Sequence, residues 1–203
     1  MTTKPLNITL QELLKKADGK AISFRELVIS LRGRGLAVFL ILLSLPFCLP
    51  IQIPGTSTPF GVAMALMGLR LSLGKALWWP QWLLNKPISY KLLQKLTNLV
   101  DKWFKRVKRL LKPRMTWLAE KPLLHKIHGL FITLMALLLA IPFPIPLTNL
   151  LSAFPILFMG IGLLEDDGVA ILISYFLGFI SIGFWVSILI FGHAGYLKII
   201  SII

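Results

Sequence analysis

Six polar side chains interrupt two segments of the sequence that are otherwise apolar, uncharged and rich in proline. They are Gln52, Thr56, Ser57 and Thr58 in the first segment, and Thr148 and Asn149 in the second. Polar groups are costly inside a membrane and mark a site or a pathway there. The helices expected to begin at Phe60 and Leu150 would also direct free N–H groups toward these residues. Two such helix ends could hold a phosphate or another anion.

Three further polar residues each have more than one possible role. Asn149 could cap the helix that begins at Leu150, and this role is compatible with binding. Arg70, at the end of the first segment, and Arg114, in the linker between the segments, could each pair with a lipid phosphate. For both arginines, extension of the side chain to the membrane–water interface is the favoured role.

The remaining titratable groups do not form an enzyme site. His125 and His128 could share a helix face and bind a metal ion or a proton, but an interfacial polar pair is favoured. The acidic run from Glu165 to Asp167 is better explained by the positive end of the helix that follows it than by metal binding. The sequence has no G-x-S-x-G, H-E-x-x-H or Walker motif. We therefore expect no enzymatic activity, cofactor or metal.

The two proline-rich segments are copies of an internal repeat. Residues 45–50 read L-P-F-C-L-P and residues 141–146 read I-P-F-P-I-P. Apolar runs follow both, in which Gly68 and Gly74 match Gly162 and Gly168. Proline-broken apolar segments at matching positions of two halves indicate a transporter binding site, although a duplicated structural hairpin is the alternative. The residues expected to break the helices are Pro46, Pro50, Pro54 and Gly55 in the first copy, and Pro142, Pro144 and Pro146 in the second.

The composition is that of a membrane protein. Apolar residues make up 56% of the chain, the mean hydropathy is +0.80 and the net charge is +14. Thirteen of the 22 basic residues fall between Lys75 and Lys126, and seven fall between Lys4 and Arg34. Beside such apolar flanks, these groups indicate anionic lipid headgroups as partners rather than nucleic acid. The charged first 35 residues predict a cytoplasmic N-terminus without a signal peptide.

The hydrophobic pattern predicts an all-α integral membrane protein. Residues 1–35 should form cytoplasmic amphipathic helices, over 8–17 and from Phe24 onward, the second begun by a Ser23–Glu26 capping box. Residues 36–203 should form one membrane domain: repeat 1 at 36–74, a basic linker at 75–126, repeat 2 at 129–168 and a transmembrane helix at 169–192. Within the repeats we expect helices over 37–45, 60–73, 130–140 and 150–164. The helix before each break, 37–45 or 130–140, would be long enough to cross about half of the hydrocarbon core of a membrane.

Two features of this arrangement stay open in the sequence. The linker helix at 88–111 should lie in the membrane interface, with packing against the protein as the alternative. Each repeat could be a re-entrant hairpin or a single broken span. Hairpins are favoured, because they place the N-terminus, the basic linker and residues 165–167 on one side of the membrane. A homo-oligomer is also compatible with the sequence.

Six short motifs follow one another along nearly the whole chain. They are S-x-x-E-L-V-x-x-L-x-x-R-G at 23–35, L-P-x-x-L-P then P-G-T-S at 45–57, Trp79-Pro80, Lys112-Pro113-Arg114, P-x-P-x-x-N at 144–149, and G-x-x-x-x-D-G at 162–168. In this order and spacing they resemble the ExoD family of bacterial exopolysaccharide-synthesis membrane proteins. One departure is Ser152-Ala153, where members often have Pro-Ala. The resemblance implies a role in exopolysaccharide production or envelope homeostasis in the bacterial inner membrane, and no known reaction.

Two hypotheses about function follow. In the first, the two breaks form a polar site near the membrane midplane of a transporter or flippase-like protein that handles a phosphorylated polyprenyl carrier. In the second, the chain is a non-transporting accessory subunit of a polysaccharide synthesis or export complex, which docks through its amphipathic helices and through Lys102, Lys105 and Arg109. An ion antiporter is disfavoured, because the repeats contain no carboxylate at membrane depth.

Overall fold

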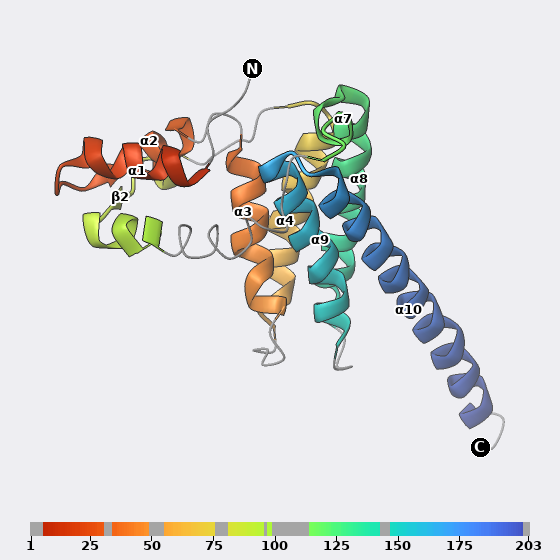
Figure 1. The fold of residues 1–203 in the computed structure, drawn as a ribbon. Helices are drawn as coiled ribbons and strands as arrows, with labels where there is room; N and C mark the ends of the chain where they lie inside the picture. Colours follow the sequence, from red (N-terminus) through yellow and green to blue (C-terminus); the bar gives the residue numbers. More distant parts are fainter. Residues whose placement is uncertain are drawn as a thin grey trace.

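A bundle of four helices forms the centre of the protein in the computed structural model (Figure 1). The structure describes residues 6–30, 34–48, 55–75, 81–95, 97–98, 114–142 and 147–200. The first repeat contributes α3 (Gly35–Ser44), the short 3-10 helix η1 (Leu45–Cys48) and α4 (Ser57–Ser72). The second contributes α8 (Pro122–Ala140) and α9 (Thr148–Glu165). Each repeat is thus a helical hairpin whose two ends return to the same end of the bundle (Figure 1).

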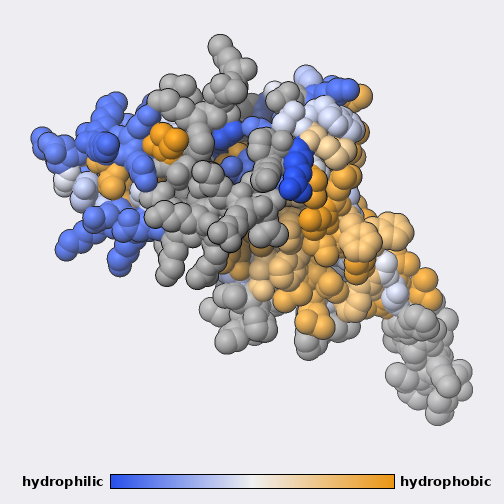
Figure 2. Space-filling view, viewed as in Figure 1, coloured by the Kyte–Doolittle hydropathy of each residue, from blue (hydrophilic) through white to orange (hydrophobic). Residues whose placement is uncertain are grey.

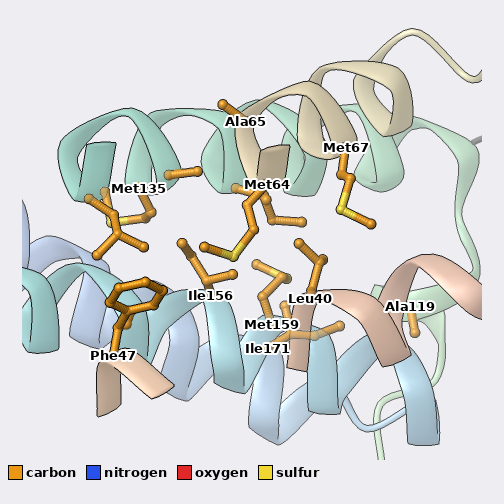
Figure 3. Packing of buried hydrophobic residues seen from close by; sticks show 14 of the residues in the cluster. Leu40, Phe47, Met64, Ala65, Met67, Ala119, Met135, Ile156, Met159 and Ile171 are labelled. Carbon is orange, nitrogen blue, oxygen red and sulfur yellow. The ribbon is translucent and has the colours of Figure 1, made fainter. Parts of the chain in front are cut away.

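The two repeats are packed across one another. The main contacts of α4 are with α8, and those of α3 are with α9, so each first helix packs on the second helix of the other repeat. All four helices contribute to the core, in which Leu40, Met64, Met135 and Ile156 are completely buried and point toward one another (Figure 3). Neither repeat could bury its apolar side chains in this way alone.

Glycines allow α4 and α8 to approach closely. A Cβ atom at Gly61 would lie 2.7 Å from the Ala136 carbonyl oxygen, and one at Gly68 would lie 2.7 Å from the Thr133 nitrogen. A Cβ atom at Gly129 would collide with the backbone of Ser72. Small residues that bring helix backbones together are typical of membrane bundles. The glycines after the first break therefore bring the backbone of α4 close to that of α8.

Several helices begin earlier than the sequence analysis predicted. Helix α4 starts at Ser57 rather than Phe60, because Pro59 lies in the first turn, where no intrahelical N–H donor is required. Helix α9 starts at Thr148 rather than Leu150, after Leu147 at a left-handed φ of 79°. Helix α8 starts at Pro122, eight residues before the predicted Leu130. Its 19 residues give a length of about 28 Å, a full hydrocarbon thickness rather than half of one.

An N-terminal unit lies against the side of this bundle (Figure 1). It comprises α1 (Leu6–Ala17), β1 (Ile22–Ser23) and α2 (Phe24–Ser30), with α5 (Gln81–Leu84) and β2 (Pro87–Ile88) from the linker. Strands β1 and β2 pair antiparallel, with Ile22 opposite Ile88. A second buried cluster includes these two residues and Leu93, and it reaches Ala37 of α3 and Leu164 of α9. The N-terminal segment and the start of the linker therefore share one core.

The predicted capping box is confirmed. The Glu26 backbone N–H donates to the Ser23 hydroxyl at 3.3 Å, and the Ser23 backbone N–H donates to the Glu26 carboxylate at 3.2 Å. The predicted linker helix, in contrast, cannot begin at Ile88, which belongs to β2; the helix begins at Tyr90. Its first turn packs on the N-terminal unit, with Leu93 fully buried, which favours the alternative of a helix packed on protein for this part. Residues 99–113 lie outside the described part of the chain.

The last long helix, α10 (Gly168–Ile200), packs on α9 near its start and leans away from the bundle farther along (Figure 1). Among the described residues, three helices are long and apolar enough to cross a membrane: Pro122–Ala140, Thr148–Glu165 and Gly168–Ile190. Figure 2 shows hydrophobic surface over the bundle and α10, and hydrophilic surface on the N-terminal unit and near α7 (Trp117–Glu120). The predicted class, an all-α membrane protein, is confirmed.

Candidate functional site

The two proline breaks meet at one end of the bundle. Helices α4 and α9 both begin there, and α3 and α8 both end there (Figure 1). The Thr58 hydroxyl donates a hydrogen bond of 2.9 Å to the carbonyl oxygen of Ala140, the last residue of α8. The structure therefore brings polar groups from both repeats together, and we call this end of the bundle the break end.

The polar side chains at the start of α4 and α9 differ in burial. Ser57 and Thr148 are 4% and 1% exposed, whereas Thr56 and Asn149 are half-buried. Asn149 is the second residue of α9, so the prediction that it caps a helix from Leu150 is wrong. Gln52, Pro50 and Pro54 of the first break, with Pro144 and Pro146 of the second, lie outside the described residues.

The described part of the break end is shaped by aromatic packing and contains no charged side chain. Phe47 of η1 is buried and meets Phe60 of α4 edge to face, with ring centroids 5.5 Å apart. Helix η1 also packs on α9, so the first break rests against the second repeat. Pro46, Gly55 and Pro142 are exposed at the ends of their helices. Electrostatics here come from neutral dipoles, namely hydroxyl groups, the Asn149 amide, the positive ends of α4 and α9, and the negative ends of α3 and α8.

The two predicted arginines lie away from the break end. Arg70 is in the last turn of α4, 13 residues beyond Ser57, which corresponds to about 20 Å along a helix. Arg114 is exposed, and its carbonyl oxygen accepts a hydrogen bond of 2.7 Å from the backbone N–H of Gly168 at the start of α10. Neither arginine can therefore share one small ligand with Thr56 or Thr148.

A tight turn joins α9 to α10 at the end opposite the break end. Asp166 takes a left-handed conformation with φ 54°, and the Asp167 N–H donates to the Gly162 carbonyl oxygen at 2.9 Å. The buried Asp167 carboxylate then accepts from the Val169 N–H at 2.9 Å, which caps α10. Arg34 forms a salt bridge of 2.9 Å with Asp166. These contacts give Asp167 and Gly168 a structural role in the turn. The sequence predicted such a role for the acidic residues that precede this helix.

The buried His128 has partners on two neighbouring elements. Its Nε2 lies 2.8 Å from the Leu118 carbonyl oxygen and its Nδ1 lies 2.6 Å from the Tyr175 hydroxyl. Because a carbonyl only accepts, Nε2 carries the proton and Nδ1 can accept from Tyr175. His125 is half-buried, and its Nδ1 lies 3.0 Å from the Lys121 carbonyl oxygen. The centroids of the two histidine rings lie 6.3 Å apart, in edge contact, and no group of three or more potential metal ligands exists among the described residues. The sequence did not identify Tyr175 as the partner of His128, because nothing in the local sequence distinguishes this tyrosine.

The fold defines a multi-helix membrane protein whose polar groups gather at the helix breaks of two repeats. The chain belongs to the ExoD family, "Exopolysaccharide synthesis, ExoD", which matches residues 6–187. It is 34% identical to "Protein ExoD" of Rhizobium meliloti over 178 residues, which cover 85% of this chain and 72% of that protein. It is also 34% identical over 166 residues to an uncharacterized protein of Synechocystis sp., with 81% and 77% covered. No solved structure matches.

Proposed function

We propose that this chain handles a phosphorylated polyprenyl carrier in exopolysaccharide synthesis, by binding its headgroup at the break end. The single observation that supports this most is the junction of the two repeats, where Thr58 of one contacts Ala140 of the other and α4 and α9 begin at the same end of the bundle (Figure 1). The first turns of α4 and α9 offer N–H groups without intrahelical acceptors. Anions bind at such helix starts without a charged side chain.

The exposed faces of the bundle suit the rest of a lipid carrier. Val62 and Leu66 of α4, Leu137 of α8 and Ile141 directly after α8 are between 43% and 57% exposed. A polyprenyl chain would lie along this apolar surface, as membrane lipid does, while the phosphate stays at the helix starts. The described break end has no acidic, basic or histidine side chain, which favours binding over acid–base catalysis.

The position of the site differs from the predicted midplane location. Helix α4 runs 16 residues from the break end to the opposite end of the bundle, so the headgroup would lie near one membrane surface. The exposed basic residues Lys15 and Lys16 belong to α1 of the N-terminal unit, and Lys95 belongs to the linker helix that packs on it; this unit lies away from the break end (Figure 1). By the positive-inside rule we assign the N-terminal unit to the cytoplasm of a bacterial inner-membrane protein. The headgroup would then bind in the outer leaflet of that membrane.

Cysteine accessibility tests this proposal. Single cysteines at the half-buried Thr56 and Asn149, in a Cys48→Ser background, are probed in membrane vesicles with an impermeant thiol reagent. We expect modification from the side opposite the N-terminus and protection by undecaprenyl phosphate. A cysteine at Arg70, at the other end of α4, is the matched control and should not be protected. Modification of the cysteines at 56 and 149 at unchanged rates in saturating carrier would overturn the proposal.

Loss-of-function variants supply a second test. Asn149→Ala and Gln52→Ala should lower exopolysaccharide output while leaving the amount of folded membrane protein unchanged. Full output from both variants would contradict the proposed headgroup site, whatever the accessibility results.

A second candidate function is that of an accessory subunit, and exposed apolar residues on the N-terminal unit favour it. Ile29 and Leu92 are 67% and 49% exposed, and Lys91 and Arg25 are exposed on the same unit. Such a mixed surface could bind anionic headgroups or an acidic face of a polysaccharide-assembly protein. Reversing Lys15, Lys16 and Lys91 to Glu should then abolish copurification of that partner; unchanged copurification would reject this function. Lys102, Lys105 and Arg109 lie outside the described residues.

A further inference from the structure

Three completely buried serines lie between α9 and α10, a helix pair that is otherwise apolar. The Ser174 hydroxyl of α10 donates a hydrogen bond of 2.6 Å to the Pro155 carbonyl oxygen of α9. Farther along, the indole N–H of Trp185 donates to the Ser152 hydroxyl at 3.2 Å. Ser181 is the third of these serines, and it lies on α10 between the two contacts. We call the strip between the two helices the serine seam.

Ser181 faces α9 within the serine seam. It follows Ser174 by seven residues and precedes Trp185 by four, and both spacings return to the same face of an α-helix. Because Ser174 and Trp185 both contact α9, the side chain of Ser181 is directed to the same helix. Its hydroxyl is buried, yet it has no hydrogen-bond partner among the described residues. Such an unsatisfied group in a packed interior requires an explanation.

The facing helix has a polar group whose usual partner is missing. Pro155 lies inside α9 and has no N–H, so the carbonyl of Leu151, four residues earlier, lacks its intrahelical donor. Leu151 directly precedes Ser152, whose hydroxyl already accepts from Trp185. In a membrane, carbonyls freed by proline are satisfied by hydroxyl side chains of neighbouring helices or by ordered water. The serine seam thus combines two hydroxyls and one free carbonyl within the bundle.

We propose that the serine seam is a binding site for water, which bridges Ser181, Ser152 and the Leu151 carbonyl. A buried water needs two to four polar partners that include donors and acceptors, and these three groups provide both. An ion fits less well, because no charged side chain lies among described residues 147–164 or 168–190 to pair with it. The hydrated groups would extend from near the start of α9 into the bundle. This proposal does not depend on the proposed lipid ligand.

Reaction of engineered thiols tests for water in the seam, because the thiolate that reacts with methanethiosulfonates forms where water reaches it. Ser181→Cys is compared with Ser187→Cys, both in the Cys48→Ser background. Ser187 is the matched control, since it lies on an exposed face of α10 and bonds to its own helix at the Gly183 carbonyl oxygen. We expect the cysteine at 181 to react measurably with a small methanethiosulfonate, although the serine that it replaces is completely buried. No reaction at 181 under conditions that modify the cysteine at 187 would overturn the proposal.

The change in thermal stability caused by Ser181→Ala is an independent test, because a hydrated seam and a dry seam predict changes of opposite sign. In a hydrated seam this change removes a partner of the bridging water, so the midpoint of thermal unfolding should fall. In a dry seam the change removes an unsatisfied hydroxyl, so the midpoint should stay the same or rise, and the proposal would be rejected. Ser187→Ala should leave the midpoint unchanged. Neither readout requires a lipid carrier, so this inference and the proposed function can fail separately.

Discussion

Thr58 and Ala140, 82 positions apart in the sequence, are joined by a hydrogen bond of 2.9 Å between the Thr58 hydroxyl and the Ala140 carbonyl oxygen. The bond ties the start of α4 to the end of α8, where the last carbonyls of a helix have no intrahelical donor. One side chain thereby links the two repeats at the point where both are broken.

Replacing Thr58 by Val keeps the shape of the side chain and removes this donor. We expect the free energy of unfolding to fall by about 1 kcal/mol, the usual net contribution of one such bond. Unfolding in detergent micelles measures the change. Ser72→Ala is the control, because the exposed Ser72 hydroxyl at the other end of α4 bonds only to its own helix at Leu69. The same loss in both variants would show that the Thr58 bond has no special role.

Gly68→Ala and Gly183→Ala should have opposite effects on stability. The new methyl at Gly68 would meet the Thr133 nitrogen and the Gly129 carbonyl oxygen at 2.7 and 2.8 Å, so α4 and α8 must separate. At Gly183 of α10, nothing lies within 4 Å, and alanine favours helix by about 1 kcal/mol. The unfolding midpoint should therefore fall for Gly68→Ala and rise for Gly183→Ala. A rise for both variants would contradict the close contact between α4 and α8.

Asp167→Ala should destabilise the protein by about 1 kcal/mol, because the Val169 N–H at the start of α10 loses its capping acceptor. Asp167→Asn keeps an acceptor oxygen and should lose much less. Chemical denaturation of the purified protein compares the two variants. If Asn were as harmful as Ala, the negative charge rather than the capping bond would be the stabilising feature.

The Arg34–Asp166 salt bridge should be weak and sensitive to salt. Its side chains are 15% and 36% exposed, and exposed pairs of this kind contribute about 0.2–1 kcal/mol. A double-mutant cycle with Arg34→Ala and Asp166→Ala, measured at low and high salt, isolates the pair from other contacts of either residue. The coupling energy should shrink as salt rises. A coupling that does not change with salt would mean that the pair is screened from solvent.

Local signals predicted several elements correctly. The Ser23–Glu26 capping box and the end of the first helix at residue 17 are local features, and the structure shows the box and a turn with positive φ at both Asp18 and Gly19. The repeat and the uncharged apolar stretches likewise identify the helices of the bundle. Strand β2 at Ile88 could not be predicted in this way, since a two-residue strand exists only because Ile22 pairs with it.

Pro155 shows a similar limit within the bundle. A proline disfavours the interior of a helix, yet α9 continues through it, and the Pro155 carbonyl accepts from Ser174 of a different helix. The proline frees the carbonyl of Leu151, so α9 depends there on donors from outside its own helix, which the local sequence does not show.

The chain's composition, repeat and capping residues are enough to define an all-α membrane protein with two broken repeats, because apolar length and helix signals act within a few residues. The packing of the helices decided everything that depends on distance. It placed Thr58 against Ala140, put Arg70 at the far end of α4 and joined the linker to the N-terminal unit. Such contacts depend on which apolar faces bury one another, and residues that are adjacent along the chain do not determine that choice.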